Sequence, residues 1–387
     1  MTGDVADLLA ALNEAPPFAA LAVLTGHLKD MVGAKGVSLL LADYGERTLE
    51  RLDEGRPMRS AESVPVGGSV AGRAFRRQET LVFPYEEGES HRVYVPVSIR
   101  ADRLGLLDLI LVEAPDEAVL DRLRHVATTL AYVIAAARPF SDIFERVRRY
   151  QRLEPAAEIQ WSLLPALAYE GDSVSLAGIL EPAYEFGGDN FDYAVEEGAL
   201  TVSVTDAMGH GLRAALVGSL AVNALRNARR SGLTLVEHAG AANTALLSQF
   251  DSEQFVSALL ARIDLSTGAI EVVNAGHPCA YLVRGTEIAE LAWEADYPLG
   301  MFDDTSYRTQ RGELVRGDRL VLLSDGVLEA RSEAGDQFGA ERAIEVIDAT
   351  RALAPTEVVR LVIEAVLDHR AGPMHDDATV VCIDWKK

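Results

Sequence analysis

Four aspartates border apolar, strand-like segments or tight bends, and this pattern constrains the fold more than any other feature of the chain. Short runs rich in Val, Leu and Thr are typical of buried β-strands. The four acids are Asp206 after residues 201–205 (TVSVT), Asp325 after 320–324 (LVLLS), Asp376 shortly before 378–383 (ATVVCI), and Asp189 after the glycine pair at 187–188. A further acid, Asp377, lies next to Asp376. The pattern predicts sheets whose strand ends carry carboxylates.

Each of these acids alone is a weak signal, because Asp-Gly after a strand marks a turn and an acid before a strand is commonly a solvated edge. Together they predict more. Strand ends converge at one rim of a pair of sheets, where clustered carboxylates repel each other unless cations lie between them. Hard cations such as Mg²⁺ and Mn²⁺ take oxygen ligands from a few carboxylates and keep several waters. The four acids are therefore candidate metal ligands.

Charge and composition narrow the class of protein. The 387 residues carry a formal charge of −23, and residues 151–387 hold 37 acidic and 18 basic side chains. This acidity disfavours binding to nucleic acid or to an anionic membrane surface. Cys279 and Cys382 form no zinc-binding pair or disulfide framework. The acidic N-terminus is unlike a signal peptide, and the most apolar stretch, 126–137, is too short to span a bilayer. We expect a soluble, cytoplasmic protein.

The order of elements predicts an α+β protein with two domains. Residues 1–138 alternate helices with antiparallel strands and contain a Gly-rich loop, as in a small sensor module. Residues 139–166 are helical and interrupted by prolines, which indicates a connecting segment. An apolar stripe that includes Phe144, Val147 and Tyr150 suits a dimer contact. Residues 167–387 predict two antiparallel sheets packed as a sandwich and flanked by helices.

Seven ordered segments between about residues 155 and 385 resemble the metal-dependent serine phosphatases of the protein phosphatase 2C superfamily. They are GGDNFD, DAMGHG, NAGHP, PLG, GDRLVLLSDGVLEA, FG and DDATVV, preceded by AAEIQWSLLP, which resembles the lead-in helix of that catalytic domain. The match is closer to the bacterial branch that includes RsbU and the sporulation stage II phosphatase. Residues 1–138 resemble a GAF domain through their strand pattern, GGSVAGRAFRRQETLVF and closing helix.

The resemblance implies a site with two divalent cations, Mn²⁺ or Mg²⁺. Asp206 would bridge the two ions, and Ala207 would offer its carbonyl oxygen to one of them with Asp189 nearby. Asp325 and Asp376 would hold the other ion. Water activated by the metals attacks phosphorus directly in this family, so no nucleophilic Ser or Cys is required.

Several positions depart from the family pattern or have two interpretations. A histidine that serves as general acid in the eukaryotic branch is replaced here by Met208. His210 is typical of the bacterial branch and is not assigned to acid catalysis. Asp192 and Asp377 match the family motifs either as supporting site residues or as structural ones. His277 suits a turn and packing role as well as a site role.

The resemblance predicts a protein serine/threonine phosphatase that acts on a phosphorylated anti-sigma-factor antagonist, a STAS-domain protein, under the control of the GAF domain. The alternative is a catalytically silent member that binds a phosphoprotein as a regulatory scaffold. We expect a homodimer, and the GAF ligand or partner is not readable from the sequence.

Overall fold

The computed structural model divides the chain into two compact units, Met1–Arg152 and Leu153–Lys387, and each is described by itself. The structure describes residues 2–387 except 54–55, 58–62, 86–88, 150, 182–186, 251, 279, 371, 373 and 375, so Tyr150 and Cys279 lie outside the described residues. The segment at 139–166 contributes α5 (Ile143–Arg148) to the first unit and α6 (Pro155–Leu163) to the second. None of the helices in the described ranges is long and apolar enough to cross a membrane.

The first unit is built on one antiparallel sheet with the strand order β3-β2-β1-β7-β6-β5, and β4 pairs with β2. Its strands are β1 (Ala34–Ala42), β2 (Thr48–Asp53), β3 (Arg56–Pro57), β4 (Val64–Pro65), β5 (Leu81–Tyr85), β6 (Ser90–Ile99) and β7 (Asp102–Leu111). The central strands β1 and β7 are buried along most of their length, as expected for strands covered on both faces.

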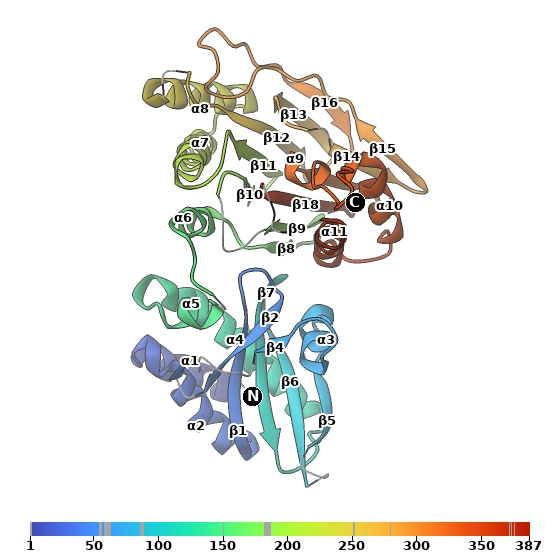
Figure 1. Ribbon diagram of the computed structural model, residues 1–387. Helices are drawn as coiled ribbons and strands as arrows, with labels where there is room; N and C mark the ends of the chain where they lie inside the picture. Colours follow the sequence, from blue (N-terminus) through green and yellow to red (C-terminus); the bar gives the residue numbers. More distant parts are fainter. Residues whose placement is uncertain are drawn as a thin grey trace. The chain divides into compact units, whose positions relative to one another are not determined.

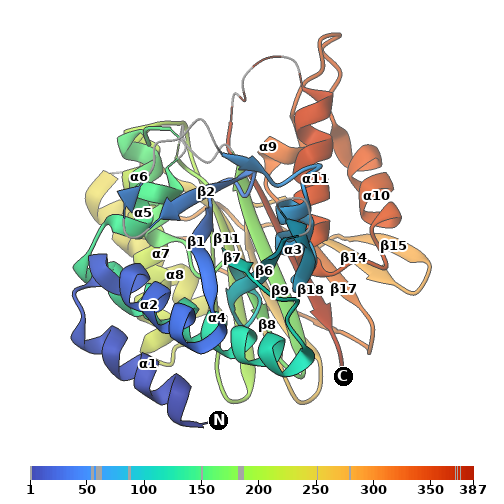
Figure 2. The same ribbon diagram turned by 90° about the horizontal axis from the view of Figure 1, so that it is seen from below.

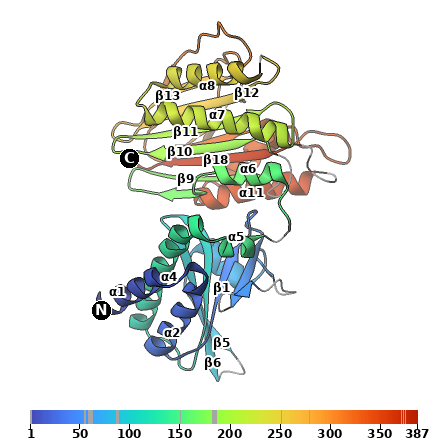
Figure 3. The same cartoon turned by 90° about the vertical axis from the view of Figure 1, so that its left-hand side faces the viewer.

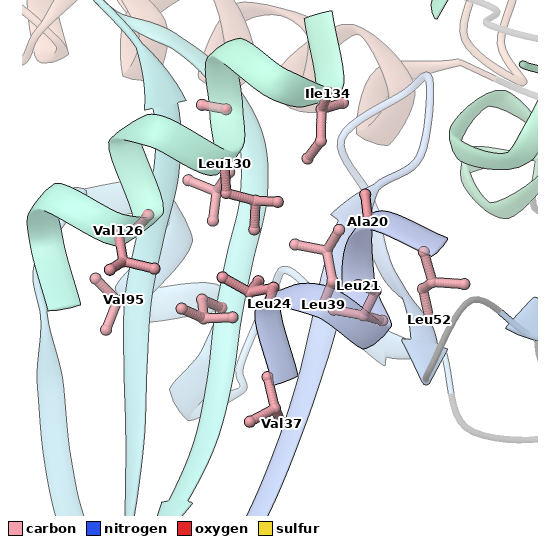
Figure 4. Packing of buried hydrophobic residues seen from close by; sticks show 14 of the residues in the cluster. Ala20, Leu21, Leu24, Val37, Leu39, Leu52, Val95, Val126, Leu130 and Ile134 are labelled. Carbon is pink, nitrogen blue, oxygen red and sulfur yellow. The ribbon is translucent and has the colours of Figure 1, made fainter. Parts of the chain in front are cut away.

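Helices cover both faces of this sheet. On one face, α1 (Thr2–Glu14), α2 (Ala20–Val32), α4 (Glu117–Ala137) and α5 enclose the larger core. The α4 side chains Val126, Leu130 and Ile134 recur at intervals of four and form its buried stripe, which Figure 4 shows facing the sheet and α2. On the other face, α3 (Val70–Arg77) buries Phe75 completely.

Two side chains of the stripe predicted as a dimer contact have a different environment. Phe144 and Val147 of α5 are buried in the larger core of the first unit, which also contains residues of α1, α2 and α4. They are therefore not available as an exposed seam, and the homodimer stays a prediction.

The second unit contains two antiparallel sheets. One has the order β10-β11-β12-β13-β16, and the other has the order β15-β14-β17-β18-β9-β8. The strands are β8 (Ala168–Glu170), β9 (Val174–Glu181), β10 (Asn190–Val195), β11 (Ala199–Ala207), β12 (Val256–Asp264), β13 (Ala269–Ala275), β14 (Ala280–Arg284), β15 (Glu287–Leu291), β16 (Gln310–Glu313), β17 (Arg319–Leu323) and β18 (Ala378–Trp385).

The two sheets pack face to face and are flanked by helices. Apolar side chains from both sheets, among them Leu200, Val202, Leu322 and Val381, form the core between them. Helices α7 (Leu212–Arg230) and α8 (Leu235–Phe250) lie side by side over the first sheet (Figure 3). Helices α10 (Gly339–Ala349) and α11 (Pro355–His369) lie side by side outside the second (Figures 1 and 2). This arrangement confirms the predicted two-sheet sandwich flanked by helices.

Candidate metal centre

The predicted carboxylates come from both sheets of the second unit and are brought together at one end of the sandwich. Asp206 lies near the end of β11, whereas Asp325 follows β17 and opens the short helix α9 (Asp325–Leu328). Asp376 and Asp377 directly precede β18, which pairs with β17 through Leu323 and Val380. The negative charges of Asp325, Asp376 and Asp377 all act on Asp206. The strand ends therefore converge as the sequence predicts.

The turn that carries Asp325 is packed directly on the backbone beside Asp377. A Cβ atom at Gly326 would lie 1.9 Å from the carbonyl oxygen of Asp377, so only glycine fits there. Two hydrogen bonds join the same two segments. The Ser324 N–H donates to the Thr379 carbonyl (3.0 Å), and the Thr379 N–H donates to the Ser324 hydroxyl (2.9 Å). The Asp-Gly motif thus positions Asp325 against the segment that precedes β18.

The glycine pair before Asp189 places this acid beside β11. Gly187 has a φ of +147°, and a Cβ atom at Gly188 would lie 3.1 Å from the carbonyl oxygen of Ala207. The Ala207 N–H donates a hydrogen bond to the carbonyl of Gly188 (3.2 Å). This close approach of the two backbones joins Asp189, Asp206 and the Ala207 carbonyl in one site.

Burial and mutual repulsion make these carboxylates weak acids. Loss of water on burial raises the pKa of Asp206 to about 7, and repulsion from the neighbouring acids adds to the effect. Burial, followed by the charges of Asp206 and Asp377, raises the pKa of Asp189 well above its usual range. Burial also raises the pKa of Asp377 to about 7. Such a cluster favours either protons or cations.

The free oxygen atoms of the cluster fit a divalent cation. Asp189 Oδ2, Asp325 Oδ1 and Asp377 Oδ1 are buried and have no hydrogen-bond partner, which is costly unless another group binds them. Within the described ranges, no three His, Cys, Asp or Glu side chains are placed to hold one ion together. Mg²⁺ and Mn²⁺ are hard cations, and Mg²⁺ in particular needs only one or two carboxylates plus other oxygens and water. The donor set therefore fits cations of this kind.

Asp192 is directed away from the carboxylate cluster. Its side chain is buried, and its two oxygens accept hydrogen bonds from Arg226 and Arg229 of α7, each at 2.7 Å. Arg226 also donates to the carbonyl of Leu163 at the end of α6. This ion pair supports a structural role for Asp192, because both of its oxygens already have cationic partners.

The three other positions with open roles have distinct environments. His277 is buried in the Asn-Ala-Gly-His turn, where its backbone N–H donates to Asn274 Oδ1 (2.9 Å). The ring nitrogen Nδ1 of His277 lies 2.9 Å from the Ser257 hydroxyl. Ser257 is the cross-strand neighbour of Asp206. Met208 and His210 are exposed in the loop after β11, and the charge of His210 acts on Asp376, which is also exposed.

One residue of the site carries no recognisable signal in the sequence. Gln160 of α6 is 3% exposed, and its amide contacts both Asp189 and Asp377. A single glutamine in a helical segment is ordinarily a surface residue. Only the fold brings it next to Asp377, which is 217 positions away in the sequence.

Comparisons with known proteins find a matching family and several relatives. Residues 196–386 match the model of the family Stage II sporulation protein E (SpoIIE). Phosphoserine phosphatase RsbU of Bacillus subtilis (strain 168) is 24% identical over 237 residues, which cover 60% of this chain and 70% of RsbU. Protein IcfG of Synechocystis sp. and phosphoserine phosphatase RsbP of Bacillus subtilis match over less than half of their own length.

One solved domain supports this fold, with a TM-score above 0.5. The PP2C domain of SiaA from Pseudomonas aeruginosa aligns with a TM-score of 0.52 and 23% identity, over 60% of this chain and 94% of that domain. The catalytic domain of the serine/threonine phosphatase PstP, solved with two manganese ions, aligns with a TM-score of 0.43 and 18% identity, over 56% of this chain and 99% of that domain.

Proposed function

We propose that this chain, whose residues 196–386 match the SpoIIE family, is a protein phosphatase of the PP2C type that uses divalent cations to hydrolyse phosphoserine or phosphothreonine. The observation that carries the proposal is the convergence of carboxylates from two sheets, with buried oxygens that lack partners. Carboxylates clustered in this way repel each other, and bound cations would relieve that repulsion.

Each residue of the site has a proposed role in binding the cations. Asp206, Asp189 and the carbonyl of Ala207 would hold one divalent cation, and Asp325 and Asp376 would hold a second one beside Asp206. When bound, Mn²⁺ or Mg²⁺ supplies an activated water and neutralises charge on the phosphoryl group. The tight backbone packing at Gly188 and Gly326 keeps the carboxylates in place during the reaction. Among the residues that the structure describes, Cys382 is buried within β18, so its thiol takes no part.

The proposed substrate is a phosphorylated anti-sigma-factor antagonist of the STAS class. The match of 60% of the chain to a phosphoserine phosphatase, RsbU, supports a phosphoserine protein as the substrate. A catalytically silent scaffold is the alternative, and the complete set of carboxylates argues against it.

We propose further that residues 1–138 act as a GAF-type sensor, which binds a ligand or partner and controls the phosphatase (167–387) through the segment at 139–166, within a homodimer. The antiparallel sheet of the first unit, covered by helices on both faces, supports this role. Comparing the turnover of the full chain with that of residues 153–387 measures the sign of this control. Light scattering at micromolar concentration tests the dimer, which a monomer would contradict.

The central experiment measures hydrolysis of p-nitrophenyl phosphate and of a phosphorylated antagonist protein with Mn²⁺, with Mg²⁺ and with EDTA. We expect turnover that requires metal and is lost in Asp206→Asn. Asp303→Asn is the matched control, because Asp303 is exposed and outside the cluster. Turnover in EDTA, or full turnover in Asp206→Asn, contradicts the proposal. Tight binding of the phosphoprotein without turnover would instead favour the silent scaffold.

A further inference from the structure

We infer that Gln160 is a positioning residue for the metal centre: its amide holds the carboxylate of Asp377 and the backbone of Asp189 in the arrangement that cation binding needs. This inference rests on the proposed function, because it concerns the same site. It assigns a role to α6, the helix that precedes the sheets of the second unit and supplies none of the proposed metal ligands.

The contacts of the Gln160 amide form a closed arrangement. Its Nε2 donates to the carbonyl of Asp189 (2.7 Å) and to Oδ2 of Asp377 (3.0 Å). The same Oδ2 accepts a hydrogen bond from the N–H of Asp189 (3.2 Å). One side-chain amide and one carboxylate oxygen therefore hold both backbone polar groups of Asp189, the acid proposed to contact a cation.

Charge explains why the arrangement needs an amide donor. Asp189 and Asp377 repel each other, and Asp377 contacts the Asp189 segment with one oxygen while its other oxygen has no partner. Without Gln160, the Asp377 carboxylate keeps only the N–H of Asp189 among these contacts, and the Asp189 carbonyl loses this side-chain donor. Both groups are buried, so water is a poor substitute.

The rest of α6 is fixed independently of Gln160. Ala156 packs against the bend at Gly187, where an added Cβ would lie 3.1 Å from the Ala156 side chain. Arg226 of α7 donates to the Leu163 carbonyl at the end of the helix. A substitution that removes only the amide of Gln160 should therefore leave the helix in place.

The test compares Mn²⁺ binding by full-length chains with calorimetry. Gln160→Met keeps the length and approximate volume of the side chain but removes its hydrogen bonds. We expect the Kd for Mn²⁺ to rise about 10- to 100-fold, as for other residues that orient metal ligands. Ser162→Ala is the matched control, because Ser162 is exposed on the same helix and donates only to the Ile159 carbonyl; its Kd should equal that of the wild type.

Two further measurements separate positioning from a general defect. In the Asp377→Asn background, Gln160→Met should have a smaller effect on the Kd, since one of the two contacts of the Gln160 amide is with the Asp377 carboxylate. Excess Mn²⁺ should restore the turnover of p-nitrophenyl phosphate by Gln160→Met, which a folding defect would not allow. If Gln160→Met does not fold, Gln160→Asn, with an amide too short to reach, is measured in its place.

The outcomes distinguish this inference from the proposed function. If the wild-type chain binds no Mn²⁺, both fail. If the wild type binds Mn²⁺ and Gln160→Met binds it equally well, the inference alone is wrong. An equal loss in Ser162→Ala, or an undiminished loss in the Asp377→Asn background, also overturns it.

Discussion

The ion pair of Asp192 with Arg226 and Arg229 leads to a sharp prediction about stability. Asp192 is 3% exposed, and its two arginine partners are largely buried with side-chain exposures of 16% and 13%. Asp192→Ala leaves both guanidinium groups without their carboxylate partner. Breaking a buried ion pair by removing one partner costs about 3–5 kcal/mol, so we expect the second unit to lose about this much free energy of unfolding.

A matched variant of an exposed ion pair sets the scale. Arg213 and Glu253 are joined at 3.3 Å, but their side chains are 64% and 75% exposed. Exposed pairs contribute about 0–1 kcal/mol, so Glu253→Ala should change the free energy of unfolding by no more than that. Each variant removes the acidic partner of an arginine in the same unit, and the two ion pairs differ mainly in how deeply they are buried.

The assay follows tryptophan fluorescence of the full chain during urea unfolding. All three tryptophans, Trp161, Trp293 and Trp385, lie in the second unit, so the signal reports that unit alone. Folded Asp192→Ala, measured well below its unfolding transition, should bind Mn²⁺ with the affinity of the wild type. A loss of less than 1 kcal/mol would refute the reasoning about the buried pair, and weaker Mn²⁺ binding would place Asp192 in the metal centre instead.

Two other predictions follow from the site. Gly326→Ala should disrupt Mn²⁺ binding and lower the urea midpoint, because its Cβ would lie 1.9 Å from the Asp377 carbonyl oxygen; Gly240→Ala, in a helix with open space around it, should not. Burial lowers the pKa of His277 to about 4, so the unfolded chain binds the extra proton first as the pH falls below 6.5. Proton uptake by the unfolded chain should therefore lower the free energy of unfolding by about 3 kcal/mol between pH 6.5 and 4. His277→Gln should remove this part of the pH dependence, and an unchanged profile would contradict it.

The sequence allowed the strands near the acids to be predicted because apolar β-branched runs and small residues mark them locally. Asp206 and Asp325 are found in this way, since Asp206 lies near the end of the buried strand β11 and Asp325 lies just after the buried strand β17. Gln160 could not be found, because its role depends on Asp377, which the chain brings near only after both sheets have formed. Phe144 and Val147 were misassigned for a similar reason: an apolar stripe on a helix does not reveal whether it packs on its own domain or on a second copy.

The position of β18 in its sheet has a consequence for the synthesis of the protein. It lies between β17 and β9, and it is the last strand of the second unit to leave the ribosome. Its pairing partner β9 is made about two hundred residues earlier, so the sheet stays open along both neighbouring edges until translation of this unit is nearly finished. Unpaired edges of this kind bind other strands readily, and distant pairing is slow. We expect nascent chains to depend on chaperones at this stage, and the acids before β18 to join the others only in the final step of folding.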